Sequence, residues 1–98
     1  MSFEVLVGMQ VTDELRYQEY RNRMTPLLEA AGGGFRYDFR VSETLQGDLR
    51  TINRLFAIYF PDAAARDAFF ARPDYLAIRQ QWWMGAVGDR VVIAEYTR

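Results

Sequence analysis

GFRYDFRVSETLQGDLRTINRLFAIYF, residues 34 to 60, is the stretch that decides the fold of this chain. Its first part, GFRYDFRVSETL at residues 34–45, alternates apolar and polar side chains, as a β-strand with one polar face does. QGDLR, residues 46 to 50, has the composition of a turn, and TINRLFAIYF, residues 51 to 60, is a second, largely apolar strand. Two strands joined by a short polar loop predict a β-hairpin.

The alternation predicts two chemically different faces for the first strand of the hairpin. One face would carry Phe35, Tyr37, Phe39 and Val41, and the other would carry Arg36, Asp38, Arg40 and Ser42. If the polar face lines a cavity, Asp38 is a candidate base and its neighbouring arginines are candidate ligands for an anion or enolate. Two flanking cations would lower the pKa of Asp38 and weaken it as a base. The alternative is that these charges solvate an edge strand.

A helix is predicted on the N-terminal side of the hairpin. Thr12 and Asp13 offer N-cap oxygens, and the following apolar residues recur at spacings of three and four: Tyr17, Tyr20, Met24, Leu27 and Ala31. Pro26 predicts either a kink or two helical pieces, and AAGGG at residues 30–34 supplies a glycine C-cap. The Tyr20 hydroxyl either donates into a cavity or finds a partner inside the core.

Helices are also predicted on the C-terminal side of the hairpin. One begins at Pro61 and Asp62, where the carboxylate can cap the first turn, and a short second one begins at Pro73. In FFARPDYLAIRQQWW, residues 69 to 83, one stripe of core side chains is formed by Tyr75, Ile78 and Trp82. Trp83 lies about 100° further round the helix, so one of the two indoles is at the boundary of that stripe. There it caps a pocket, packs on a partner subunit or lies half exposed with its indole N–H in water. Arg79 precedes Trp83 by four residues and is expected to stack on its ring.

Two further strands complete the chain, at residues 3–11 and 90–96. The element order is then β-α-β-β-α-β, which predicts an α+β, ferredoxin-like single domain over residues 1–98, with helices on one face of a four-stranded antiparallel sheet. Apolar residues occur at both parities of the first, third and last strands, so the bare face needs a second layer. We expect a homodimer with sheets face to face; the alternative is a monomer with an exposed sheet.

Individual residues on these strands have alternative interpretations as well. Arg54 follows the turn and is expected to pair with Asp38 across the hairpin. Glu95 is either a carboxylate base or a solvated residue near the end of its strand.

The composition excludes several classes of chemistry. The chain has no Cys and no His, which excludes disulfides, thiol nucleophiles, a Ser-His-Asp triad and proximal-His haem ligation. It also has no Lys, so a Schiff base is excluded. We expect no cofactor and no metal. The net charge of -1 gives no reason to expect nucleic acid or a membrane as a partner. The first residues do not resemble a signal peptide, so a cytoplasmic protein is expected.

Several residues together resemble a known family. They are Tyr17 and Tyr20, the Thr25-Pro26 pair, the glycines before Phe35-Arg36, the Phe60-Pro61 strand end and the segment Arg72-Pro73-Asp74-Tyr75. In order and spacing these residues resemble an uncharacterised domain-of-unknown-function family of the dimeric α+β barrel superfamily. It is related to NIPSNAP-like and antibiotic-biosynthesis-monooxygenase-like proteins. Where the family usually has Ser before the proline, this chain has Arg72, which removes a side-chain cap.

The resemblance implies ferredoxin-like subunits paired through their sheets, with a cavity beside the sheet. The wider superfamily includes cofactor-free monooxygenases and isomerases, and the family brings no established catalytic residue. The resulting hypothesis is a homodimer that binds a small aromatic or anionic metabolite, acting as a cofactor-independent oxygenase or isomerase. The alternative is a non-catalytic dimeric interaction or structural domain. Six residues are candidate ligand contacts: Tyr20, Arg36, Asp38, Arg54, Arg79 and Trp83.

Overall fold

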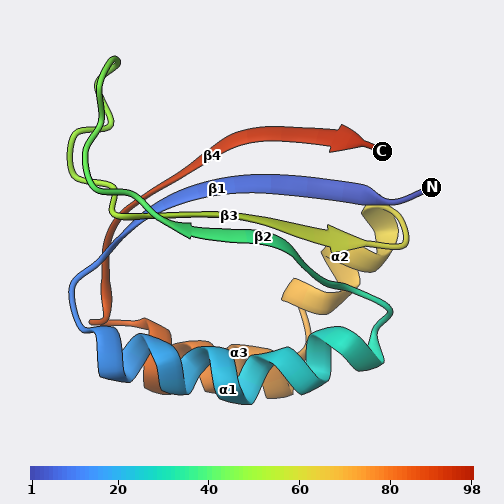
Figure 1. The fold of residues 1–98 in the computed structure, drawn as a ribbon. Helices are drawn as coiled ribbons and strands as arrows, with labels where there is room; N and C mark the ends of the chain where they lie inside the picture. The colour runs from blue at the N-terminus through green and yellow to red at the C-terminus, as the bar shows by residue number, and fades with distance from the viewer.

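The protein is built from one layer of helices and one four-stranded sheet (Figure 1). In the computed structural model, which describes residues 1–98, the elements follow the predicted order. They are β1 (Phe3–Val11), α1 (Glu14–Ala30), β2 (Gly34–Arg40), β3 (Arg54–Phe60), α2 (Ala63–Phe70), α3 (Pro73–Ile78), the π-helical turn η1 (Arg79–Trp83) and β4 (Val87–Thr97).

The sheet has the strand order β2-β3-β1-β4, and every neighbouring pair is antiparallel. β1 and β3 therefore lie at the centre, with Val5 opposite Ile58 and Val7 opposite Phe56. This is the split β-α-β arrangement of a ferredoxin-like fold, and it confirms the fold predicted from the hairpin and its flanking helices.

The capping predictions for α1 are confirmed. The Asp13 carboxylate accepts a hydrogen bond from the backbone N–H of Arg16, and Gly32, with φ of 84°, ends the helix. α1 is continuous through Pro26, so the alternative of two helical pieces is wrong. The Thr25 hydroxyl donates to the Arg21 carbonyl at 2.5 Å, which satisfies a backbone acceptor in the turn that precedes the proline.

The hairpin loop is longer than the sequence predicted. β2 ends at Arg40 and β3 begins at Arg54, and residues 41–53 form an arm that rises past the helix-free face of the sheet (Figure 1). Asn53 fixes the base of this arm, because its side-chain amide accepts from the Val11 N–H at 2.8 Å and donates to the Val11 carbonyl at 2.9 Å. β4 is also longer than expected, since it begins at Val87.

The segment after β3 contains the two predicted helices and one irregular turn. The Asp62 carboxylate caps α2 by accepting from the Ala65 N–H, as expected. α3 begins at Pro73 without a side-chain cap from Arg72. From Arg79 onward the chain widens into a π-helical turn, closed by a hydrogen bond from the Met84 N–H to the Arg79 carbonyl at 3.0 Å.

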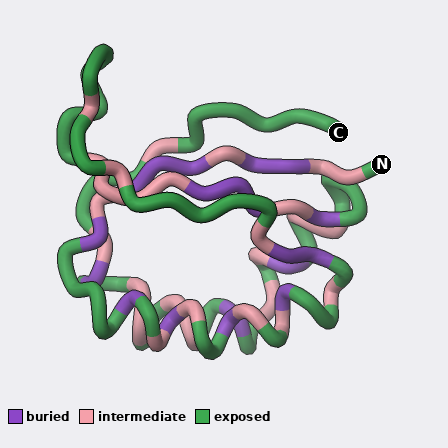
Figure 2. Tube along the Cα trace, in the orientation of Figure 1, coloured by how far each residue is buried: buried purple, intermediate pink, exposed green.

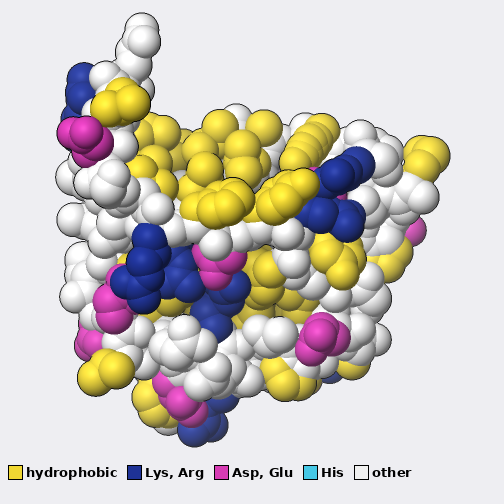
Figure 3. Space-filling view, in the orientation of Figure 1, with side chains coloured by type: hydrophobic (Ala, Val, Ile, Leu, Met, Phe, Trp, Pro, Cys, Tyr) yellow, Lys and Arg dark blue, Asp and Glu magenta, His cyan; other side chains and the backbone are white.

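The core lies between the sheet and the helices. Its buried side chains come mainly from the central strands β1 and β3 and from the inner side of α1 (Figure 2). The opposite surface, which we call the outer sheet face, carries no helix. Its apolar side chains include Leu6, Tyr37, Phe39, Leu55, Ile93 and Tyr96. Figure 3 shows hydrophobic side chains gathered on this side of the sheet.

The predicted two faces of β2 are wrong over part of the strand. A β-bulge lies between Phe35 and Tyr37, and it places two residues of β2 against one of β3. After the bulge the alternation changes phase, so Phe35 shares the helix-facing side with Asp38, whereas Arg36 lies on the outer sheet face. Arg36 is thereby separated from the two residues with which it was expected to form a cluster, Asp38 and Arg40.

None of the helices combines the length and the apolar composition that crossing a membrane requires.

Candidate functional site

A cavity of about 310 Å³ lies between the sheet and the helix layer. The apolar part of its wall includes Val5, Val7 and Met9 of β1, Phe56 and Ile58 of β3, Met24 of α1, Phe70 of α2, Trp83 and Val92. β1 supplies odd-numbered residues because alternate side chains of a strand point to one face. The helical layer adds the rings of Phe70 and Trp83. The cavity is therefore part of the core region that the side chains leave unfilled.

Two tyrosine hydroxyls form the polar feature of the cavity interior. Tyr20 of α1 and Tyr75 of α3 both line the cavity, and their oxygens are 2.8 Å apart. Burial raises the pKa of Tyr20 well above its ordinary value, and the adjacent Tyr75 hydroxyl adds to this effect. Burial also raises the pKa of Tyr75, against the opposing effects of its hydrogen bond with Tyr20 and the positive charges of Arg79 and Arg90. Both tyrosines are therefore uncharged at neutral pH, and each keeps its hydroxyl proton.

Charged side chains from the C-terminal part of the chain complete the cavity wall. Arg66, Arg79, Arg90 and Glu95 all border the cavity. Arg66 donates to the Glu95 carboxylate at 2.6 Å, so these two charges are paired. Neither Arg79 nor Arg90 has a carboxylate within 4 Å. The Arg79 guanidinium lies 4.8 Å from the Trp83 ring centre, which confirms the predicted stacking.

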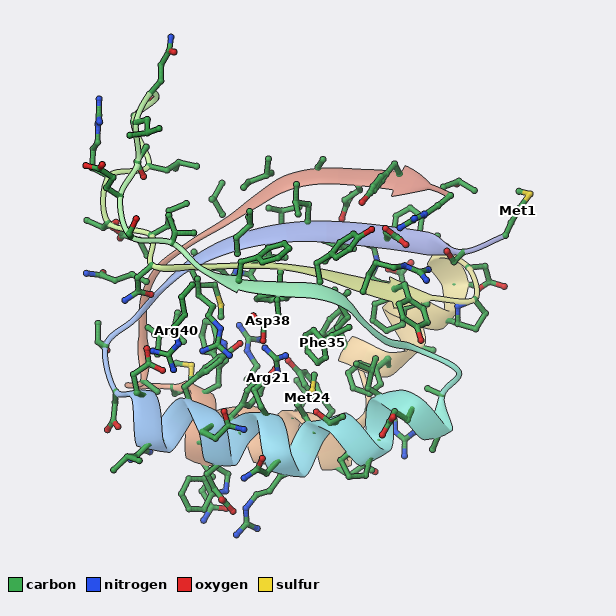
Figure 4. All side chains as sticks on the ribbon, in the orientation of Figure 1. Met1, Arg21, Met24, Phe35, Asp38 and Arg40 are labelled. Carbon is green, nitrogen blue, oxygen red and sulfur yellow. The ribbon has the colours of Figure 1, made fainter.

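A second cluster closes the β2 side of the space between sheet and helices (Figure 4). Asp38 binds Arg21 at 2.8 Å and Arg54 at 2.9 Å, so the predicted Asp38–Arg54 pair is confirmed. Arg21 also donates to the Tyr17 hydroxyl and lies 3.5 Å from the centre of the Phe35 ring. Burial alone would raise the pKa of Asp38, but its bonds with the two arginines outweigh burial and hold that pKa below its ordinary value.

A third cluster lies on the outer sheet face, around a fully buried carboxylate. Glu4 accepts hydrogen bonds from Arg36 at 2.7 Å, from the Tyr96 hydroxyl at 2.9 Å and from Arg98 at 3.4 Å. These partners cover the carboxylate only as a thin layer, because no helix lies on this face. Burial would raise the pKa of Glu4, and the hydrogen bonds of Arg36 and Tyr96 lower it by more.

The six candidate ligand contacts thus fall into three places. Tyr20, Arg79 and Trp83 line the cavity. Asp38 and Arg54 belong to the cluster on the β2 side, and Arg36 lies on the outer sheet face. No group of three or more carboxylates is placed to hold a metal ion.

The sequence did not predict several polar residues of the cavity wall, among them Arg66, Tyr75 and Arg90. The spacing places Tyr75 in the core stripe. Only the hydroxyl of Tyr20, on α1, is predicted as a possible donor into a cavity. Arg90 was treated only as the first residue of a strand. Its signal was the parity of β4: Arg90 lies opposite Met9 and therefore on the helix-facing side.

The fold and the cavity describe a ferredoxin-like α+β protein, and comparison with solved structures agrees. A protein of unknown function from Rhodopseudomonas palustris superposes with a TM-score of 0.85 at 18% identity, covering 99% of this chain and 82% of the other. A DABB family protein with a ferredoxin-like fold from Mesorhizobium loti superposes with a TM-score of 0.71 at 20% identity, covering 99% and 96%. An EthD family protein from Bacillus halodurans is more distant, with a TM-score of 0.52 at 14% identity, covering 91% and 98%.

Residues 5–96 match the family described as Domain of unknown function (DUF1330). The chain belongs to this family, which agrees with the resemblance identified from the sequence. No curated protein matches it significantly.

Proposed function

We propose that this protein is a homodimer that binds a small aromatic or anionic metabolite in the cavity between its sheet and its helices. The observation that carries the proposal is an apolar cavity with a hydroxyl pair inside it and two arginines that lack carboxylate partners on its wall. A mostly apolar pocket with a few converging polar groups is the usual form of a small-molecule site.

The size of the cavity limits what it can hold. At roughly 30 Å³ for each water, about ten waters would occupy its volume of about 310 Å³. That space suits a molecule with one aromatic ring and a short substituent. It is too small for a dinucleotide or a tetrapyrrole.

The reaction class we propose is a cofactor-independent oxygenation or isomerisation. The support is the superfamily resemblance, together with the Tyr20–Tyr75 pair, which can donate a hydrogen bond to a substrate oxygen on which charge develops. Glu95 is the one carboxylate on the cavity wall, and its ion pair with Arg66 holds it in position. Asp38, the base considered from the sequence, is not used in this proposal because two arginines occupy its oxygens.

The homodimer is supported by the outer sheet face. Two strands of seven residues, β2 and β3, together with the adjoining parts of β1 and β4, cover roughly 400 Å² in projection at about 4.8 Å per strand and 3.3 Å per residue. Most of this face is apolar, and apolar patches that approach this size are often functional surfaces, a protein–protein interface among them. Tyr37 is 49% exposed and Phe39 is 54% exposed in the single chain, so a second copy would bury substantial aromatic surface.

A non-catalytic dimeric interaction or structural domain is the alternative, and one observation favours it. Arginine partners hold the carboxylates of Glu4, Asp38 and Glu95, which leaves none of these three unpaired as a general base. In this alternative the cavity is a packing defect of the core, and the apolar sheet face is the functional surface.

Native mass spectrometry of protein purified without added ligand tests the proposal. We expect a dimer that carries a small-molecule adduct, and we expect Val92→Trp to lose the adduct because the indole would occupy the cavity. Leu76→Trp is the matched control, since both residues are 42% exposed and Leu76 is not part of the cavity wall. A dimer without adduct, and without any binding to added aromatic acids or amides, would favour the non-catalytic alternative.

A further inference from the structure

The polar groups of the cavity wall define the class of molecule that the cavity takes. This inference rests on the proposed small-molecule binding and makes it more specific. We propose that the ligand is an aromatic or otherwise apolar carboxylic acid, whose carboxylate binds Arg79 and Arg90 while its apolar body occupies the cavity.

The first argument is the charge balance of the wall. Three arginines and one glutamate border the cavity, and the glutamate is already paired with Arg66. Arg66 also binds Asp67 at 2.7 Å, so its guanidinium has two carboxylate partners. Two net positive charges therefore remain on the wall, and both belong to side chains without an acidic partner, Arg79 and Arg90. A monoanion would neutralise part of this charge, whereas a cation would be repelled.

The second argument is the convergence of these arginines from two parts of the fold. Arg79 follows Tyr75 by four residues on consecutive helical turns, so both side chains lie on one side of the helix layer. Arg90 lies opposite Met9 in the sheet, and Met9 is itself part of the cavity wall. The charges of both arginines act on the Tyr75 hydroxyl, which places the positive field inside the cavity as well as at its edge.

The third argument is that the Arg79 guanidinium is held in place. It lies 4.8 Å from the Trp83 ring centre, and this cation–π contact favours its position without using its N–H donors. A planar guanidinium with free donors matches the two oxygens of a carboxylate. A phosphate gains further from backbone N–H groups at a helix N-terminus, and α3 begins at Pro73, at the other end of its helix from Arg79.

The hydroxyl pair adds a second polar contact. Two hydroxyls carry two protons, and the hydrogen bond between Tyr20 and Tyr75 uses one of them. The remaining proton can be donated to an oxygen on the body of the ligand. An acid with a ring hydroxyl or carbonyl oxygen would use both features.

Isothermal titration calorimetry with matched probes tests this inference. The probes are benzoate, its neutral isostere benzamide, and phenyl phosphate. We expect benzoate to bind about tenfold more tightly than benzamide, as one charge-assisted interaction would give. Arg79→Gln and Arg90→Gln should each remove most of that preference and leave benzamide binding unchanged. Arg79→Lys should retain part of it, because the charge remains and the planar fork is lost.

The control is Arg50→Gln, which removes the same charge from the exposed loop 41–53, away from the cavity. It should leave the preference for benzoate unchanged, and all variants should melt within a few degrees of the wild type. Equal binding of benzoate and benzamide would overturn the carboxylate inference while leaving the proposed cavity function in place. Tighter binding of phenyl phosphate than of benzoate would also overturn it. If none of the three probes binds at about 1 mM, the inference is wrong for aromatic acids, and the adduct measurement then decides separately on the cavity function.

Discussion

At the scale of single residues, Glu4 and Arg36 determine part of the stability of the sheet. Glu4 is fully buried, and its shortest ion pair is with Arg36, at 2.7 Å between nitrogen and oxygen. Arg36→Ala should lower the free energy of unfolding by about 1 kcal/mol, the low end of the cost of an unsatisfied buried group, because Tyr96 and Arg98 still donate to the carboxylate. Urea denaturation measures this.

Ligand binding provides the contrasting readout for the same variant. On the sequence alone Arg36 is a candidate ligand contact, so its substitution by Ala would be expected to weaken binding. The bulge in β2 reverses that expectation, because Arg36 lies on the opposite face of the sheet from the cavity. Benzoate affinity should be the same in Arg36→Ala as in the wild type, and a loss of affinity without a loss of stability would contradict this assignment.

Asp38 provides a prediction about pH. Its pKa is lower in the folded protein than in the unfolded chain, where it has the ordinary value near 3.8, so the folded state binds fewer protons. The stabilisation is therefore fully present above that value and is lost as the pH falls through the lower, folded pKa. Asp38→Asn should lower the free energy of unfolding at pH 7 by about 1 kcal/mol, as for a modest, partly exposed ion-pair network.

The same substitution should reduce the pH dependence of stability below about pH 4, where the wild-type carboxylate takes up its proton. Thermal melts of both proteins between neutral and acidic pH measure the difference. Glu19→Gln is a suitable control, since its pair with Arg23 lies on the exposed side of α1, between side chains that are 36% and 50% exposed. If the stability of Asp38→Asn fell with decreasing pH as steeply as that of the wild type, the Asp38 pairs would contribute nothing to folding.

Among single residues, the sequence predicted contacts that depend on local spacing and failed where the spacing changed. The Arg79–Trp83 stack and the Asp38–Arg54 pair follow from a helical turn and from a hairpin, and both are present. The location of Arg36 depends on one bulge, which the unbroken alternation of residues 35–41 does not reveal. Arg90 and the Tyr75 hydroxyl join the cavity only through contacts between distant segments.

At the scale of elements, the join between α1 and β2 depends on the glycine run. Gly33 has no room for a side chain, because an added Cβ would lie 2.6 Å from the Tyr59 carbonyl oxygen and 2.7 Å from a Leu28 methyl carbon. A clash with backbone cannot be relieved by a rotamer change, so Gly33→Ala should lower the free energy of unfolding by about 1–3 kcal/mol. Gly34→Ala should cost less, since the nearest atom there is the hydroxyl oxygen of the Tyr59 side chain, which can move.

Equilibrium denaturation of the two glycine variants measures this difference between adjacent positions. Gly47→Ala is a less suitable comparison despite its open surroundings, because its φ of 103° makes any side chain strained. Equal stability of Gly33→Ala and the wild type would mean that β2 can shift away from Tyr59 at little cost.

The elements themselves were largely predictable, because their signals are local. Caps at Asp13 and Asp62, the proline at Pro73 and the apolar runs of the strands define where helices and strands begin. The long arm at residues 41–53 was not predicted, since TINRLFAIYF reads as one strand from residue 51. In the structure the Asn53 side chain binds the Val11 backbone, and regular pairing starts only at Arg54.

At the scale of the whole molecule, the outer sheet face and the cavity lie on opposite sides of the same sheet. The cavity is lined from the helix-facing side of the sheet, whereas the outer sheet face is proposed to be covered by a second copy. Dimerisation and ligand binding should therefore be separable by substitution. Ile93, 45% exposed on the outer sheet face, and Leu15, 87% exposed on α1, are suitable test and control positions.

Ile93→Glu should convert the dimer to a monomer, because pairing would bury a carboxylate without a partner. A cost of several kcal/mol weakens association by about 100-fold or more. Light scattering with size-exclusion chromatography measures the mass, and Leu15→Glu should remain dimeric. The monomeric Ile93→Glu protein should still bind benzoate with wild-type affinity, since the proposed ligand contacts all lie on the helix-facing side of one chain. If the wild type is itself a monomer at micromolar concentration, the dimer proposal is wrong. If the monomeric variant loses benzoate binding, the partner copy contributes to the site, and the cavity of a single chain is not the whole of it.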